Sequence, residues 1–193
     1  IISCHLGAGS SITATKNGKA IETSMGFTPL EGLIMATRSG DIDPAIPLFI
    51  MTKEELSPSK MDVLLNRQSG IYGISGISSD FRDILKEMKE GSSRAKLAFK
   101  MFCYRVKKYI GSYYTILGGL DVLIFTAGIG ENAPLIREEI CRDLKHLGII
   151  LDHRKNKKPS RYIISTDSSP VKVLVIPTNE ELMIARETKN LIS

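Results

Sequence analysis

An apolar run that leads directly into closely spaced glycines constrains the fold of this chain more than any other feature. Residues 121–140 read DVLIFTAGIGENAPLIREEI, and the branched apolar run 122–125 predicts a strand buried on both faces. Gly128 and Gly130 follow as an expected turn, and Pro134 is placed for the first turn of a helix, where it removes no hydrogen bond. A strand, a glycine turn and a helix in succession are typical of an α/β protein.

This arrangement predicts a cradle for an anion. Backbone N–H groups are unshielded where the chain lacks Cβ atoms, and the positive end of the helix dipole attracts phosphate. The missing Cβ atoms at Gly128 and Gly130 also allow a flat ring or a ribose to approach the backbone. The alternative is an ordinary tight turn, because short glycine motifs also occur where nothing binds.

Composition limits the class of protein. A chain of 193 residues with 42% hydrophobic residues can bury a core of ordinary size, in one domain with a small subdomain. The net charge of +5 fits small anionic ligands. The only dense basic run, 154–161, lacks interleaved aromatic residues, so we expect a solvated loop and no nucleic-acid partner.

The cysteines, histidines and hydropathy give further expectations. Three cysteines and three histidines lack metal-site spacing, which favours reduced thiols in a cytoplasmic protein. No apolar run approaches a membrane span and no signal peptide is evident, so we expect no membrane partner. Because the chain begins with Ile1 and already inside an expected strand, we expect it to be part of a longer polypeptide.

A second glycine turn lies near the beginning of the chain. Strands are expected at 1–6, 12–15 and 20–24, with a hairpin turn at Asn17 and Gly18. The loop 7–11 is rich in groups that bind phosphate, and His5 at its mouth is a candidate donor to phosphoryl oxygens. The alternatives are an ordinary hairpin turn and a structural histidine bonded to the backbone.

Arg38 lies in a segment of small polar residues, TRSGDIDP at 37–44, after an apolar piece at 30–36 that we expect to be helical. A rigid turn there would display a guanidinium, which stays charged and matches the oxygens of a transferring phosphoryl group. The spacing equally allows Arg38 to pair with Asp41 or Asp43 and brace the turn.

The remaining pattern completes an α/β fold. Helices are expected over 45–66 with a break at 57–59, from a cap at Ser79 or Asp80 to residue 88, over 95–117 and over 136–147. Strands are expected at 161–165 and 171–176, and the second of these leads into a final helix capped by Thr178 or Asn179. The acids at 180–181 either support this cap or help to hold Mg²⁺.

Four blocks of sequence identify a family. HLGAGSS at 5–11, TRSGDIDP at 37–44, FTAGIGEN at 125–132 and PTNEE at 177–181 together resemble the second half of the acetate kinase (acetokinase) family, over essentially the whole chain. The resemblance implies a ribonuclease H-like, actin-like ATPase domain with a mixed sheet, hairpin strands at its N-terminus and flanking helices. Residues 1–193 would be the C-terminal nucleotide-binding domain of a two-domain kinase, and 27–117 a largely helical insertion.

The resemblance also implies a reaction and its residues. The reaction is reversible phosphoryl transfer between ATP and acetate, giving ADP and acetyl phosphate, with Mg²⁺ or Mn²⁺, in acetyl-CoA biosynthesis. Arg38 would stabilise the transferring group and Glu180 would hold the metal ion. The nucleotide would be contacted by His5, Leu6, Gly7, Ala8 and Gly9 at its phosphates, and by Asp80, Phe81, Arg82, Gly128, Ile129, Gly130, Glu131 and Asn132 at its nucleoside.

Two departures from the family qualify the implied activity. Ala8 stands where many members carry Asn, which removes one donor near the phosphates. The family's first half supplies a catalytic Asp, an Arg for the carboxylate and further phosphate contacts, so we expect this chain alone to be inactive. The alternatives are propionate kinase, butyrate kinase and a non-catalytic nucleotide-binding module, and a homodimer is expected by analogy.

Overall fold

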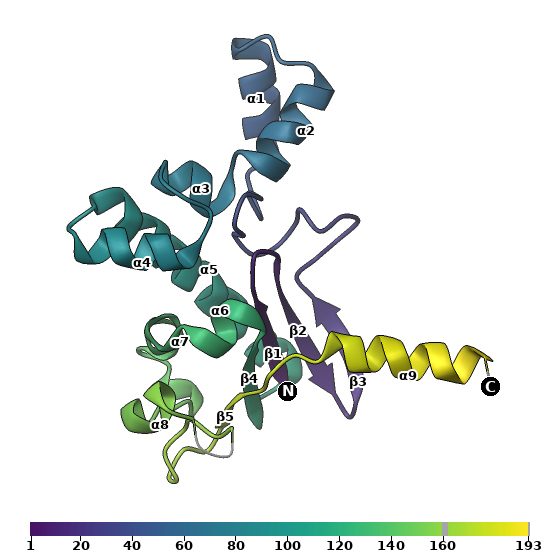
Figure 1. The fold of residues 1–193 in the computed structure, drawn as a ribbon, viewed down its shortest axis with the longest axis vertical. Helices are drawn as coiled ribbons and strands as arrows, with labels where there is room; N and C mark the ends of the chain where they lie inside the picture. Colours follow the sequence, from purple (N-terminus) through teal and green to yellow (C-terminus); the bar gives the residue numbers. More distant parts are fainter. Residues whose placement is uncertain (160–161, 193) are drawn as a thin grey trace.

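A mixed sheet of five strands forms the centre of the molecule. The computed structural model describes residues 1–159 and 162–192 and is shown in Figure 1. The strand order is β3-β2-β1-β4-β5, antiparallel from β3 to β1 and parallel from β1 to β5. The strands are β1 (Ile2–Leu6), β2 (Ser10–Lys16), β3 (Lys19–Thr23), β4 (Val122–Thr126) and β5 (Lys172–Val175). The predicted strands at the beginning of the chain, at 122–125 and at 171–176 are therefore confirmed.

The N-terminal hairpin follows from its residues. Ile2, Cys4 and Leu6 are fully buried and alternate with less buried neighbours, as a strand with one face on the core requires. Asn17 and Gly18 connect β2 to β3 with φ values of 51° and 77°. Both angles are positive, as in the two-residue turns that match the twist of a hairpin, and asparagine and glycine tolerate them best.

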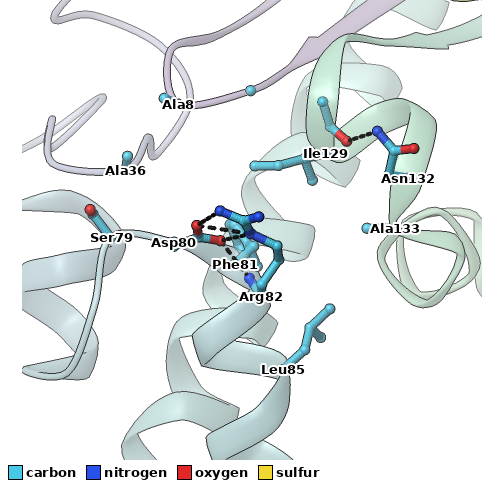
Figure 2. Close-up of a pocket in the computed structure, with 12 residues that line it drawn as sticks. Ala8, Ala36, Ser79, Asp80, Phe81, Arg82, Leu85, Ile129, Asn132 and Ala133 are labelled. Atoms are coloured by element: carbon cyan, nitrogen blue, oxygen red, sulfur yellow. Dashed lines mark hydrogen bonds and ion pairs between the residues drawn. The ribbon is translucent and has the colours of Figure 1, made fainter.

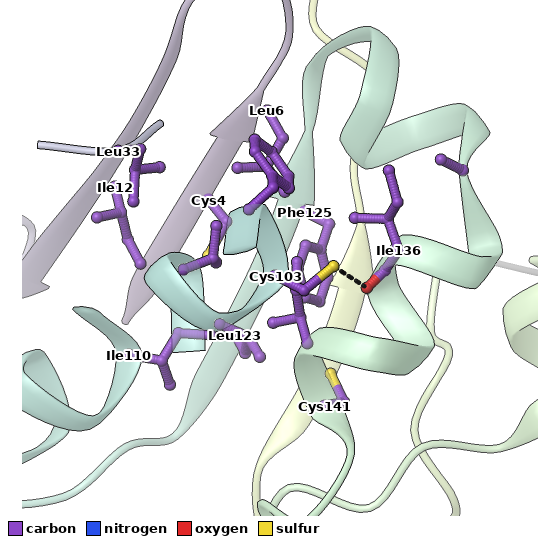
Figure 3. Packing of buried hydrophobic residues seen from close by; sticks show 14 of the residues in the cluster. Cys4, Leu6, Ile12, Leu33, Cys103, Ile110, Leu123, Phe125, Ile136 and Cys141 are labelled. Atoms are coloured by element: carbon purple, nitrogen blue, oxygen red, sulfur yellow. Dashed lines mark hydrogen bonds between the residues drawn. The ribbon is translucent and has the colours of Figure 1, made fainter. Parts of the chain in front are cut away.

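One long helix carries most of the core. The helix α5 (Ser93–Leu117) packs against β1, β2, α3 (Gly70–Ser75), α4 (Phe81–Lys89) and α7 (Pro134–Cys141). Ser92 caps it by accepting a hydrogen bond from the amide of Ala95, and Gly118 ends it with a φ of 75°. Figure 3 shows Cys103 and Ile110 of α5 facing Leu123, Phe125 and Ile136. This face of α5 is core, whereas Leu97 and Met101, which are also apolar, are 50% and 40% exposed.

The other helices lie around this centre. They are α1 (Ala45–Lys53), α2 (Pro58–Arg67), α6 (Ala127–Asn132), α8 (His153–Lys157), α9 (Glu180–Ile192) and the 3₁₀ turn η1 (Lys145–Leu147). In Figure 1, α1 and α2 project from one end of the molecule and α9 extends beside the sheet. The predicted helical subdomain over 27–117 stays a prediction. In the part of the chain that the structure describes, no helix combines the length and the apolar character needed to cross a bilayer.

Three predicted elements differ from the structure. Residues 30–36 are irregular and not helical, because their backbone groups bond to distant segments: the amide of Ala36 donates to the carbonyl of Ala8 (3.0 Å). The expected turn at 127–130 is itself the beginning of α6, and Ala127 accommodates the change with a φ of 64°. The expected helix over 136–147 ends at Cys141, and η1 follows before Gly148.

The basic run is also more ordered than predicted. Its first residues belong to α8, which Asp152 caps by accepting hydrogen bonds from the amides of Arg154 (2.8 Å) and Lys155 (2.9 Å). Its last two residues, Ser160 and Arg161, lie outside the described residues. The strand expected at 161–165 is reduced, in its described part, to isolated bridges at Ile163 and Ser165.

Candidate functional site

Three adjoining hollows open beside the carboxyl ends of β1, β4 and β5. The first, here the central pocket, has a volume of about 560 Å³. Its walls come from the β1–β2 loop, the N-terminal end of α4 and the helix α6, as Figure 2 shows. It is lined by Gly7, Ala8, Ala36, Ser79, Asp80, Phe81, Arg82, Leu85, Gly128, Ile129, Asn132 and Ala133. Four separate segments of sequence thus meet around one space.

The α4 wall is preorganised by an ion pair. Asp80 caps α4 by accepting a hydrogen bond from the amide of Arg82 (2.8 Å), and its carboxylate also receives the guanidinium of Arg82, with Nη2 at 2.6 Å from Oδ2. These hydrogen bonds from Arg82 lower the pKa of the Asp80 carboxyl below its ordinary value. The Arg82 side chain is largely exposed at the pocket rim, where a charged group can meet a ligand.

Phe81 has a different role from its neighbours. Its ring is 5% exposed and packs against the ring of Phe102 at a centroid distance of 4.7 Å. The side chain therefore anchors α4 to α5 and presents only a small surface to the central pocket.

The α6 wall combines one open glycine with one buried glycine. A Cβ at Gly128 would meet nothing within 4 Å, so this position is open to the pocket. A Cβ at Gly130 would lie 3.4 Å from the carbonyl carbon of Phe125, so Gly130 allows α6 to pack on β4. The side-chain amide of Asn132 donates a hydrogen bond to the carbonyl of Gly128 (2.9 Å), which fixes this side chain at the pocket edge.

A buried arginine holds α6 from behind. Arg137 is 1% exposed and donates from Nη1 to the carbonyls of Gly130 (2.7 Å) and Glu131 (2.9 Å). It also binds Asn156 of α8 through the side-chain oxygen (2.8 Å) and the carbonyl (2.6 Å). Arg137 thereby satisfies carbonyls at the end of α6 that the helix leaves without partners.

The β1–β2 loop offers free amides. The amide of Gly7 is used inside the loop, where it donates to the carbonyl of Gly9 (3.1 Å). The amides of Ala8 and Gly9 donate to no acceptor among residues 1–159 and 162–192. Two adjacent unpaired amides in a loop can bind an anion.

A second hollow, here the Glu180 pocket, opens toward the beginning of α9. Its volume is about 530 Å³, and it is lined by His5, Ala127, Gly128, Glu131, Thr178, Asn179, Glu180 and Glu181. The ring of His5 makes no hydrogen bond with any described residue, which favours the open histidine of the sequence analysis over a backbone-bonded one. Asn179, not Thr178, caps α9, since its side-chain oxygen accepts from the amide of Leu182 (3.1 Å).

Thr178 and Glu131 join the two sides of this pocket. The hydroxyl of Thr178 lies 2.7 Å from that of Thr126 and accepts from the amide of Ala127 (3.1 Å). The amide of Thr178 donates to Oε1 of Glu131 (2.9 Å). Sequence reasoning assigned Glu131 to the ligand and missed this connection, which no spacing along the chain indicates.

A third hollow, here the Arg38 pocket, has a volume of about 650 Å³ and shares residues with the central pocket. It is lined by Ala8, Gly9, Ala36, Thr37, Arg38, Asp62, Asn66, Arg67 and Ser79. The expected alternative partners of Arg38 are occupied elsewhere, because Asp41 pairs with Arg105 (3.2 Å) and Asp43 accepts from the amide of Ala45 (2.9 Å). Within the described residues Arg38 forms no ion pair, and its Nη1 lies 3.7 Å from the sulfur of Met35.

Most of the predicted site residues line these pockets. Leu6 and Gly130 do not: Leu6 is fully buried in the sheet, so no contact between its side chain and a ligand is available. The residues in pockets that sequence reasoning did not single out include Leu85 and Arg67. Their contribution depends on chain folding that neighbouring residues do not reveal.

The donors present suit a hard cation bound through a nucleotide. No group of three or more His, Cys, Asp or Glu side chains able to hold a metal occurs in residues 1–159 and 162–192. Glu180 nevertheless lines a polar, open pocket that adjoins the central pocket at Gly128. Mg²⁺ commonly uses one or two carboxylates, with water and phosphate oxygens as its other ligands, so a single glutamate fits this mode of binding.

Comparison with known proteins identifies the family. The sequence model of the acetokinase family matches residues 1–186. The chain belongs to the acetokinase family. It is 65% identical over 193 residues to the acetate kinase of Dictyoglomus turgidum, covering all of this chain and 48% of that protein. The chain therefore spans about half the length of the curated relatives it matches.

Solved structures of this family have the same fold. The crystal structure of Porphyromonas gingivalis acetate kinase matches all of the chain and 49% of its own length, with 46% identity and a TM-score of 0.95. A propionate kinase from Francisella tularensis subsp. tularensis SCHU S4 matches 98% of the chain and 48% of its own length, with 48% identity and a TM-score of 0.93. The predicted actin-like ATPase fold is confirmed, and the assignment to the second half of the family stays a prediction.

Proposed function

We propose that this chain supplies the nucleotide side of an ATP:acetate phosphotransferase. In this reaction a carboxylate oxygen of acetate attacks the γ-phosphorus of ATP, and the bond from that phosphorus to the ADP oxygen breaks. The observation that carries the proposal is that the central pocket shares Ala8 and Ser79 with the Arg38 pocket and Gly128 with the Glu180 pocket. A nucleotide in the central pocket could therefore extend from Arg82 toward Arg38 and Glu180. In this proposal the central pocket holds the nucleoside and the other two lie at its phosphate end.

Each group at the phosphate end has a physical reason for its role. The free amides of Ala8 and Gly9 would bind phosphate oxygens, and they would also compensate for the missing asparagine side chain at position 8. Arg38 lacks an ion-pair partner among the described residues, so its guanidinium is available to the equatorial oxygens of the transferring group. His5 would donate to phosphoryl oxygens from the side of the Glu180 pocket.

Two features of the proposal concern groups outside the chain. Mg²⁺, or Mn²⁺ in its place, would neutralise phosphate charge when bound with the nucleotide, and Glu180, which lines the Glu180 pocket together with Glu181 and Glu131, would hold it. The remaining half of a full-length relative would supply the other catalytic groups, so we propose that the chain alone does not turn over. We further propose a cytoplasmic homodimer that uses neither nucleic acid nor membrane.

Nucleotide binding is tested by closing the open glycine. Gly128→Val adds a side chain to the pocket without a clash at Cβ, so we expect the affinity of the 193-residue chain for Mg·ADP to fall about 10-fold or more in calorimetric titration. Gly111→Val is the matched control, because Gly111 is also helical, has equally open space and lies outside the three pockets. Equal affinities in the two variants would contradict the placement of the nucleotide.

Phosphoryl transfer is tested in a completed protein. In it the chain is joined to the part of the Dictyoglomus turgidum acetate kinase that lies outside the matched region. We expect acetyl phosphate formation by the completed protein and none by the chain alone. Turnover of acetate, propionate and butyrate is compared as well, since a propionate kinase is among the structural relatives. Because the Arg for the carboxylate is expected from the joined half, this comparison reports on the completed protein and not on the chain alone. Nucleotide binding without transfer in the completed protein would favour a non-catalytic nucleotide-binding module.

A further inference from the structure

A cluster of polar groups joins α5 to the irregular segment that carries Arg38. Nη1 of Arg105 lies 3.2 Å from Oδ2 of Asp41 and donates to the carbonyl of Gly32 (3.0 Å), while Nη2 donates to the carbonyl of Asp41 (3.1 Å). The hydroxyl of Tyr109 donates to Oδ2 of Asp41 (2.8 Å). We refer to Arg105 and Tyr109, with Asp41 and Gly32, as the α5 clamp.

The clamp closes the base of a loop. Oδ1 of Asp41 accepts from the amide of Gly32 (2.8 Å), and the amide of Asp41 donates to the carbonyl of Gly32 (3.0 Å), so residues 32 and 41 are joined to each other as well as to α5. Gly32 has a φ of 104° and Gly40 a φ of 67°, and a Cβ at either position would collide with backbone atoms. The backbone at both ends of this loop is therefore tightly packed in a conformation that only glycine adopts easily, and Arg38 lies near the second end.

The other side of the loop contacts the proposed phosphate site. The amide of Ala36 donates to the carbonyl of Ala8 (3.0 Å), and a Cβ at Gly9 would lie 3.6 Å from Nη1 of Arg38. The guanidinium of Arg38 itself has no ion-pair partner within residues 1–159 and 162–192 to fix it. Its position therefore depends on how firmly the backbone of the loop is held. The clamp holds one side of the loop and residues 65–71 hold the other: the amide of Ser39 donates to the carbonyl of Leu65 (3.0 Å), and the carbonyls of Thr37 and Met35 accept from the amides of Ser69 (3.0 Å) and Ile71 (2.9 Å).

The helix α5 can fix the position of Arg38 relative to the proposed nucleotide site. It packs against β1 and β2, whose connecting loop carries the free amides, and against α4, which carries Asp80 and Arg82. The clamp residues are also partly withdrawn from water, with side-chain exposures of 21% for Arg105 and 41% for Asp41. Burial and the hydrogen bond to Asp41 raise the pKa of Tyr109 further above neutral, so its hydroxyl stays a donor even in mildly alkaline solution.

We propose that Arg105 and Tyr109 are positioning residues for phosphoryl transfer, which act through Asp41 to hold the loop 32–41 and with it the guanidinium of Arg38. Neither residue lines the three pockets, so neither touches the nucleotide in the proposed site. The role of Arg38 in this inference rests on the proposed function, whereas the clamp itself rests on the contacts above. A displaced cation near the reacting phosphorus lowers the rate more than it weakens ground-state binding.

The first test measures the loop in the 193-residue chain. Arg105→Met is compared with Arg142→Met, a control whose guanidinium pairs with Glu139 (2.9 Å) and does not contact the loop. We expect amide hydrogen exchange in residues 32–41 to rise about 10-fold or more in Arg105→Met, with exchange in β1 and β4 unchanged. Unchanged exchange in the loop, or an equal rise in Arg142→Met, would overturn the clamp.

The second test measures catalysis in the completed protein. We expect kcat to fall about 10- to 100-fold in Arg105→Met and about 2- to 10-fold in Tyr109→Phe, with KM for ATP within about twofold. Arg105→Lys keeps the charge and should recover part of kcat. A fall in kcat that Arg142→Met shares, or a rise in KM for ATP with kcat unchanged, would overturn the positioning role. An inactive wild-type completed protein would contradict the proposed function, and hydrogen exchange would still decide the clamp.

Discussion

Replacing the buried Arg137 by methionine tests how the α6 wall of the central pocket is supported. The substitution keeps an unbranched side chain of similar length and removes the guanidinium. Four hydrogen bonds are lost, to the carbonyls of Gly130, Glu131 and Asn156 and to the side-chain oxygen of Asn156. The four acceptors are then left without a donor in a site where Arg137 is 1% exposed.

The expected cost follows from two opposing contributions. A buried acceptor without a partner costs about 1–3 kcal/mol, so four of them cost several kcal/mol even when some reach water. Burial lowers the pKa of Arg137 to about 10, so holding the charge there costs on the order of a few kcal/mol, and removal of the guanidinium relieves this cost. We expect a net loss of about 3–5 kcal/mol in the free energy of unfolding, similar to other buried polar networks that lose one partner.

Urea unfolding followed by circular dichroism measures this loss. The control is Arg142→Met, which removes an exposed arginine that pairs with Glu139 at 2.9 Å and should cost less than about 1 kcal/mol. We also expect weaker Mg·ADP binding in Arg137→Met, because Gly128 and Asn132 belong to the helix that Arg137 supports. Equal stability losses in the two variants would refute the reasoning, since the buried hydrogen bonds would then contribute nothing beyond a surface ion pair.

Three further outcomes are expected. Gly40→Ala should destabilise the chain by about 1–2 kcal/mol more than Gly91→Ala in thermal unfolding, because both glycines have positive φ but only Gly40 has backbone atoms against its missing Cβ. Hydrogen bonds from Arg82 lower the pKa of Asp80, so the Asp80 carboxylate stabilises the fold above about pH 4 and this effect is lost as the pH falls further. The melting temperatures of wild type and Asp80→Asn should therefore differ at neutral pH and converge in acid. Burial raises the pKa values of the cysteine thiols, so the folded chain should resist an aromatic disulfide reagent at pH ~8, and all three cysteines should react after unfolding in guanidinium.

The sheet could be predicted because its information is local. The alternation of Ile2, Cys4 and Leu6 has the period of a strand, and Asn17 with Gly18 matches the positive φ values that a tight hairpin requires. For the pockets, the sequence pattern predicted only the glycine-containing segments that line them. That these segments meet at one edge of the sheet was expected from the family resemblance alone. Local periodicity states which face of a strand is buried and does not state which strands are neighbours.

The segment before Arg38 could not be predicted, because its partners are distant in sequence. Leu33, Ile34 and Met35 are buried, and an apolar run in an irregular buried segment cannot be told from one in a helix. The partner of Asp41 was equally hidden: spacing along the chain offered Arg38, whereas Arg105, 64 residues away, donates to the carbonyl of Asp41. An ion pair expected from spacing competes with every cation that folding brings near.

The topology of the sheet explains why the site lies where it does. β1, β4 and β5 are parallel neighbours, with His5 opposite Thr126 and Phe125 opposite Val175, so the segments that leave them begin at one edge. The side chains of Cys4, Leu6 and Phe125 are fully buried, which leaves backbone amides and loop side chains as the polar groups available there. Crevices outside the carboxyl ends of parallel strands are where open α/β sheets bind ligands. The two glycine segments, more than a hundred residues apart, thus face a common space because β1 pairs with β4. A slip of one residue in that pairing would move the buried side chains of β1 to the opposite face of the sheet.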